Sequence, residues 1–171
     1  MTTVREFRNL HTHGFARVAA CTVPVAMADP ATNAARIAEQ VQALHDDGVD
    51  VALFPELSLS GYAIDDLLLQ DVLLDAVDAA VVDLAKATAK LRPVVVVGAP
   101  IRSGARLYNC AVVLHRGEVL GVVPKVNLPN YREFYEKRWF ASGDDARGTM
   151  LTRAHWPGAD EDGDVPFGPD L

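Results

Sequence analysis

Short apolar runs recur along the first hundred residues and predict buried strands. Residues 15–22 and 51–54 are runs of this kind. Residues 94–97 are four consecutive valines followed by a glycine, a pattern typical of a central strand covered on both faces.

Two longer stretches between these runs have helical spacing. The first begins at Asp29-Pro30, a favourable N-cap and first helical residue, and ends at Gly48. The second opens at Asp65, carries an apolar stripe from residue 69 to residue 84, and ends before Pro93. The resulting β-α-β-α-β order predicts an α/β fold with helices packed on a sheet.

The pattern changes after residue 100. Residues 107–114 and 119–123 flank a four-residue polar turn, which predicts an antiparallel hairpin and therefore a mixed sheet. Residues 125–148 are aromatic and charged without a clear period, as expected of a functional loop. A further strand is predicted within 148–156.

Composition narrows the function classes. The chain has 171 residues, half of them apolar, and 16 basic against 23 acidic residues give a net charge of −7. This length fits one domain or part of a larger one, and the acidity argues against nucleic acid or an anionic membrane as a partner. No apolar stretch is long enough to span a bilayer and no signal peptide is visible, so a cytoplasmic location is expected. Residues 1–14 are expected to form a loose arm.

Two residues that could carry chemistry follow predicted strand ends. Glu56 comes directly after the strand at 51–54, and Lys125 follows the second strand of the hairpin. Open α/β sheets place their sites at such ends, where a partly buried carboxylate can act as a general base and a lysine can stabilise an oxyanion. Taken alone, each residue could also be a solvated loop side chain.

The segment 130–139, NYREFYEKRW, combines aromatic, acidic and basic residues within a short stretch. It fits either a ligand-binding lid, with Glu136 as a buried carboxylate, or a salt-bridged surface helix. The histidines share no metal-ligand spacing and no phosphate-binding glycine motif occurs. Cys21 and Cys110 both lie in predicted strands and are expected to be small core residues.

Two blocks of sequence resemble the nitrilase superfamily of carbon-nitrogen hydrolases. They are FPELSLSGYAIDDLL at 54–68 and PKVNLPNYREFYEKRWF at 124–140. Within that superfamily they are similar to the N-terminal glutaminase domains of glutamine-dependent NAD+ synthetases of the actinobacterial type. The resemblance implies the N-terminal part of a four-layer αββα sandwich over residues 15–171.

The resemblance also implies an active site built on a Glu-Lys-Cys triad. By position, Glu56 matches the general base and Lys125 the triad lysine. Glu136 matches an additional active-site glutamate, and Tyr62 and Tyr131 lie where the pocket for glutamine is lined.

The nucleophilic cysteine of that family follows a later strand, and no cysteine occurs after Cys110 here. The chain alone is therefore expected to be inactive. The expected partners are glutamine, a C-terminal synthetase domain that uses ATP and Mg²⁺, and further copies in a homo-oligomer. No metal or cofactor is expected in this segment.

Two other functions stay open from the sequence. One is a stand-alone nitrilase-type amidase, and the other is a non-catalytic binding or assembly module. A sheet that ends early would also expose an edge and an apolar face, which predicts association with other chains or with the remainder of the polypeptide.

Overall fold

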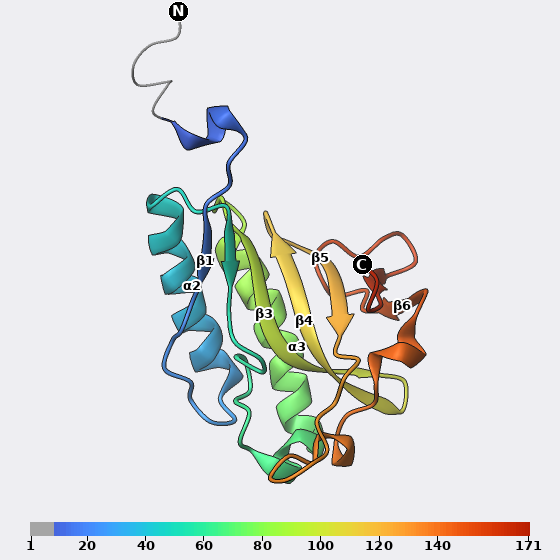
Figure 1. Cartoon of the computed structure of the whole chain (residues 1–171). Coiled ribbons are helices and arrows are strands. Elements are labelled where there is room, and N and C mark those ends of the chain that lie inside the picture. Colours follow the sequence, from blue (N-terminus) through green and yellow to red (C-terminus); the bar gives the residue numbers. More distant parts are fainter. Residues whose placement is uncertain (1–8) are drawn as a thin grey trace, which may run out of the picture.

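The computed structural model describes residues 9–171, which form a seven-stranded mixed sheet with two long helices along one face (Figure 1). The strand order is β1-β2-β3-β4-β5-β7-β6. The predicted arm at 1–14 falls partly outside the described residues. Within them, Leu10–His13 form a short 3-10 helix, η1, with the Asn9 side chain as its cap, so this part of the arm is ordered.

The first half of the sheet follows the predicted strands. Three parallel strands, β1 (Val18–Ala20), β2 (Val51–Leu53) and β3 (Val94–Ser103), are followed by the antiparallel strands β4 (Arg106–His115) and β5 (Glu118–Pro124). Two reversals of direction bring β5 parallel to β2 and β3. The carboxyl ends of β2 and β5 therefore lie at the same edge of the sheet.

The hairpin between β4 and β5 is confirmed. Its two-residue turn is Arg116-Gly117, and both residues have positive φ, 49° and 90°. Such a turn matches the twist of antiparallel strands. Beyond the long loop, β6 (Thr149–Thr152) confirms the strand predicted within 148–156. It pairs with β7 (Asp164–Phe167), which runs parallel to β5.

The first helix matches its prediction, and the second differs from it. Helix α2 (Pro30–Asp46) begins at Asp29, whose carboxylate accepts a hydrogen bond from the Thr32 N–H. The second predicted region is divided into a 3-10 helix, η2 (Asp65–Leu69), and α3 (Asp71–Thr88), because Gln70 is extended. No helix within residues 9–171 has the length and apolar character needed to cross a membrane.

The main core lies between the two helices and the sheet. Ile37 of α2, Val77 of α3 and Val97 of β3 are fully inaccessible to solvent there. The prediction that β3 is covered on both faces was wrong for its first residues. Val95 and Val97 are buried, whereas Val94 and Val96 point to the opposite face and are only half-buried.

Candidate active site

The strand ends bring Glu56 and Lys125 together, as their shared edge of the sheet requires. The Lys125 Nζ lies 2.7 Å from Oε1 of Glu56. The two residues are 69 positions apart, and each follows its strand by three residues or fewer. The predicted juxtaposition of a carboxylate and an ammonium group is therefore present.

A tight turn against β3 fixes the Glu56 backbone. The Ser58 N–H donates to the Pro55 carbonyl at 3.1 Å, and Leu57 takes a positive φ of 51°. The Ser58 hydroxyl accepts a hydrogen bond from the Gly98 N–H at 3.1 Å. The turn lies so close to β3 that only a glycine at position 98 leaves room for it.

Glu136 is the third member of this cluster. It begins the 3-10 helix η3 (Glu136–Arg138) in the long loop and is 1% exposed. Its Oε1 accepts hydrogen bonds from the Tyr62 hydroxyl at 2.7 Å and from the Lys125 Nζ at 3.1 Å. Its Oε2 lies 3.0 Å from the same Nζ, yet accepts no well-formed hydrogen bond from any residue in the described range. One ammonium group thus bridges two carboxylates.

The charges keep Lys125 protonated. Burial alone would lower the pKa of its ammonium group, but hydrogen bonds to Glu56 and Glu136 outweigh that effect and raise it. The pKa of the Tyr62 hydroxyl is raised, first by burial and then by the hydrogen bond to Glu136. Tyr62 is therefore a neutral donor at physiological pH. The cluster contains one fixed cation that can stabilise negative charge beside it.

Asn109 belongs to this cluster, although the sequence analysis did not identify it. This buried residue of β4 donates its side-chain N–H to Oε1 of Glu56 at 2.5 Å, and its carbonyl accepts the Lys125 N–H at 2.8 Å. It thus contacts both charged residues at once. The one available signal was a lone polar side chain within the apolar run LYNCAVVL.

Asn109→Leu is expected to lower the free energy of unfolding by about 1–3 kcal/mol, because it removes a donor from Glu56 while keeping most of the buried volume. Urea denaturation of the chain measures this loss, with the exposed Asn127→Leu as the control. Equal stability of the two variants would show that Asn109 does not hold Glu56.

Tyr131 is not brought into the cluster. Its side chain is 64% exposed and contacts the ring of Phe134. It lines a separate crevice of about 500 Å³ together with Leu128 and Lys137. Among the contacts of residues 9–171, none joins Tyr131 to Glu56 or Lys125.

An apolar cavity adjoins the charged cluster. It has a volume of about 510 Å³, and Glu56, Asn109 and Lys125 line it beside residues such as Val96 and Val123 from the strands. Apolar walls lower the local dielectric constant, so the charges beside them interact more strongly with a bound group than they would in water. The space is large enough for a small substrate.

Neither thiol of the chain fits the role of a nucleophile. Cys110 is buried in the core, and burial raises the pKa of its thiol well above the usual value. Cys21 is partly buried, its pKa is also raised by burial, and its Sγ donates to the Ala19 carbonyl. The thiolate form of each is therefore disfavoured at neutral pH. Within residues 9–171, no group of three or more potential metal ligands occurs.

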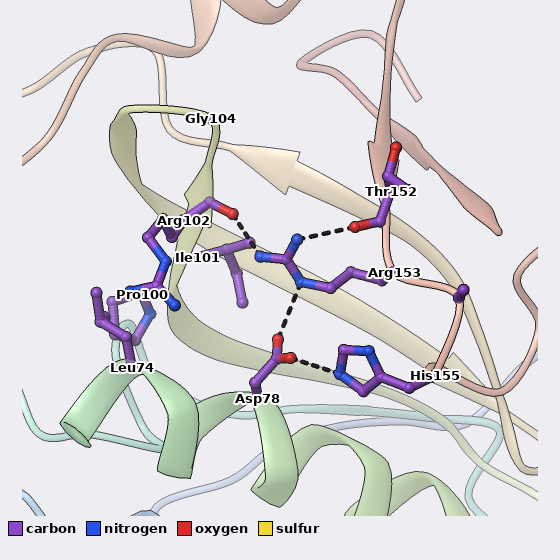
Figure 2. A pocket seen from close by; sticks show the side chains of 10 residues that line it. Leu74, Asp78, Pro100, Ile101, Arg102, Gly104, Thr152, Arg153 and His155 are labelled. Carbon is purple, nitrogen blue, oxygen red and sulfur yellow. Dashed lines mark hydrogen bonds and ion pairs between the residues drawn. The ribbon is translucent and has the colours of Figure 1, made fainter. Parts of the chain in front are cut away.

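A second crevice, of about 340 Å³, lies between α3 and the segment after β6 (Figure 2). The Asp78 carboxylate accepts a hydrogen bond from Nε of Arg153 at 3.1 Å, and it lies 2.6 Å from Nε2 of His155. Arg153 also donates to the carbonyl of Arg102, whose own guanidinium pairs with two aspartates of α3. These charged groups pair with one another. Their hydrogen bonds and ion pairs hold residues 152–156 against α3.

The family model for carbon-nitrogen hydrolases matches residues 17–155. The chain belongs to the carbon-nitrogen hydrolase family. The seven-stranded mixed sheet with its helices is accordingly the nitrilase-like α/β fold that the sequence predicted.

The chain is also similar to named proteins, among them two synthetases and an amidase. It is 55% identical over 166 residues to a glutamine-dependent NAD(+) synthetase of Mycobacterium tuberculosis, a match that covers 97% of the chain and 23% of that protein. The crystal structure of a glutamine-dependent NAD(+) synthetase from Cytophaga hutchinsonii superposes with a TM-score of 0.76 at 26% identity, over 90% of this chain and 25% of that one. A mutant of the Nesterenkonia AN1 amidase from the nitrilase superfamily superposes with a TM-score of 0.65 at 25% identity, over 74% of this chain and 48% of the amidase. The chain thus spans about a quarter of the length of the synthetases that it matches.

Proposed function

We propose that this chain is the N-terminal part of the glutaminase domain of a glutamine-dependent NAD+ synthetase. The observation that carries the proposal is the Lys125 ammonium group, which bridges the carboxylates of Glu56 and Glu136 at the common edge of β2 and β5. The names of its relatives support glutamine as the substrate. In this proposal, residues 15–171 form an incomplete domain.

The proposed reaction needs a thiol from a segment after residue 171. Glu56 accepts the thiol proton, and the thiolate attacks the side-chain amide carbon of glutamine. Lys125 stabilises the oxyanion that forms. The carbon–nitrogen bond then breaks, and protonated Glu56 gives its proton to the departing ammonia. Water hydrolyses the remaining thioester to glutamate and regenerates the thiol.

The remaining residues and partners complete this proposal. Tyr62 orients Glu136, and Tyr131 contacts glutamine when the missing part of the domain closes the pocket. A C-terminal synthetase domain that uses ATP and Mg²⁺ consumes the ammonia to amidate nicotinic acid adenine dinucleotide. The complete protein is proposed to be a cytoplasmic homo-oligomer, and no cofactor is assigned to this segment.

Ammonia release from glutamine tests the proposal, measured on this chain and on a protein of the relatives' full length that contains it. The longer protein is expected to release ammonia, whereas this chain alone releases none because neither of its thiols is correctly placed. Thiol-dependent release by the isolated chain would contradict the proposal. A longer protein that hydrolyses small aliphatic amides but not glutamine would instead be an amidase.

A further inference from the structure

The position of Glu136 depends on contacts made by its sequence neighbours. Among residues 9–171, few backbone hydrogen bonds anchor the stretch before Glu136. The Glu136 N–H donates to the Pro129 carbonyl, and the Phe134 N–H donates to the Tyr131 carbonyl within the same turn. Within the described part of the chain, no side chain caps η3. The Tyr62 hydroxyl and the Lys125 ammonium group bind the Glu136 carboxylate directly, so it is the loop backbone carrying this carboxylate that needs further support.

That support comes from the two aspartates at the start of η2. Asp66 accepts hydrogen bonds from Nε and a terminal nitrogen of Arg138, at 2.8 and 2.6 Å, and from the indole N–H of Trp139 at 2.9 Å. Asp65 accepts one from the Tyr135 hydroxyl at 3.1 Å. These contacts hold the residues on both sides of Glu136 against η2.

Asp66 binds its partners through a specific, bidentate geometry. The guanidinium of Arg138 binds its carboxylate through two nitrogens, and the Trp139 donor approaches from a neighbouring position in the chain. Hydrogen bonds from Arg138 and Trp139 lower the pKa of Asp66 to about 2, so the carboxylate is charged throughout the neutral range. The ring of Trp139 also packs against Tyr135, with centroids 4.9 Å apart.

We propose that Asp66 is a positioning residue for the site: by binding Arg138 and Trp139 it holds Glu136 on the Lys125 ammonium group. The inference rests on the proposed function in so far as Lys125 and Glu136 serve amide hydrolysis. In the hydrogen bonds and ion pairs of residues 9–171, Asp66 contacts neither Lys125 nor Glu136. A surface ion pair that did no more than add stability would leave Lys125 unaffected.

The titration of Lys125 distinguishes these two roles, because its raised pKa depends on hydrogen bonds to Glu56 and Glu136. The chain has four lysines, so their side-chain carbon signals can be followed separately by NMR, with Lys125→Gln for assignment. In Asp66→Ala, Glu136 loses its fixed position and the Lys125 pKa is expected to fall by about half a unit or more. Asp66→Glu, which keeps a carboxylate, is expected to recover part of the shift.

The control is Asp145→Ala. Asp145 pairs with Arg106 at 2.5 Å, and its side chain is exposed to a similar degree, 59% against 55% for Asp66. This variant is expected to leave the Lys125 pKa unchanged. If Asp66→Ala does not fold, Asp66→Asn is measured in its place.

An unchanged Lys125 titration in the folded Asp66 variant would overturn the inference, as would an equal shift in Asp145→Ala. Because the titration uses this chain without substrate, it does not depend on whether the longer protein hydrolyses glutamine. The two proposals can therefore fail separately.

Discussion

Lys125→Met is expected to destabilise the chain by about 3–5 kcal/mol, because it leaves the buried Glu136 carboxylate without its cation. Glu136 is 1% exposed, and Lys125 is its ion-pair partner in the described structure. The Tyr62 hydroxyl still donates its hydrogen bond to Glu136, but it is neutral and does not balance the carboxylate charge. In a longer protein that contains this chain, the same change removes the group proposed to stabilise the oxyanion, and we expect a loss of at least about 100-fold in the rate of amide hydrolysis.

Two further variants distinguish the loss of charge from the loss of packing in Lys125→Met. Lys137→Met alters an exposed lysine of η3 and is expected to cost little stability. The double variant Lys125→Met/Glu136→Gln removes both charges and is expected to recover much of the loss, because no uncompensated buried charge remains. Urea denaturation of the three variants measures these differences. A double variant that is no more stable than Lys125→Met would contradict the electrostatic explanation.

Gly98→Ala is expected to displace Glu56 and to destabilise the chain by about 1–3 kcal/mol or more. A Cβ atom at position 98 would lie 2.2 Å from the Leu57 nitrogen, 2.5 Å from the Pro55 carbonyl oxygen and 2.7 Å from the Glu56 carbonyl carbon. All three are backbone atoms, so no change of side-chain rotamer relieves the overlap. The turn that carries Glu56 must then move away from β3.

Gly121→Ala is the matched control for this second prediction. Gly121 lies in β5 of the same sheet, and an added Cβ there would meet the flexible end of the Leu171 side chain at 3.2 Å. Its cost is expected to be small. Urea denaturation measures both costs, and a crystal structure of Gly98→Ala shows whether Glu56 has moved. If the two alanine variants are equally stable and Glu56 keeps its position, the turn does not depend on Gly98.

The sequence predicted the parts of the fold that have a clear period or a strong turn signal. The strands β1 to β5, α2 and the Arg116-Gly117 hairpin are of this kind, whereas β7 was not predicted. The break at Gln70 was missed, because the apolar stripe continues through residues 69–84 although the backbone does not. The half-exposed side of β3 was also missed, since a run of valines does not reveal that only one face is covered by helices.

The site was predictable only in part, because some of its residues lie where the sequence pattern carries no information about their position. The positions of Glu56 and Lys125 after strands that share an edge favoured their meeting, and the structure brings them within hydrogen-bond distance. Glu136 lies in a loop without a period, so its approach to Lys125 depends on contacts with η2 that no spacing indicates. Asn109 lies within an apolar strand, where periodicity gives no information about a single polar side chain.

The proposed role of Glu56 is to activate a thiol that the longer protein supplies, and the rate of thioester formation measures this activation. Such a protein, with either Glu56 or Glu56→Gln, is mixed with glutamine, quenched in acid within one turnover, and examined by intact-protein mass spectrometry for a glutamyl thioester. We expect the protein that has Glu56 to form the thioester. In the Glu56→Gln protein, formation is expected to be at least about 100-fold slower, because no base accepts the thiol proton. Equal rates of thioester formation in the two proteins would show that Glu56 is not the base that activates the thiol.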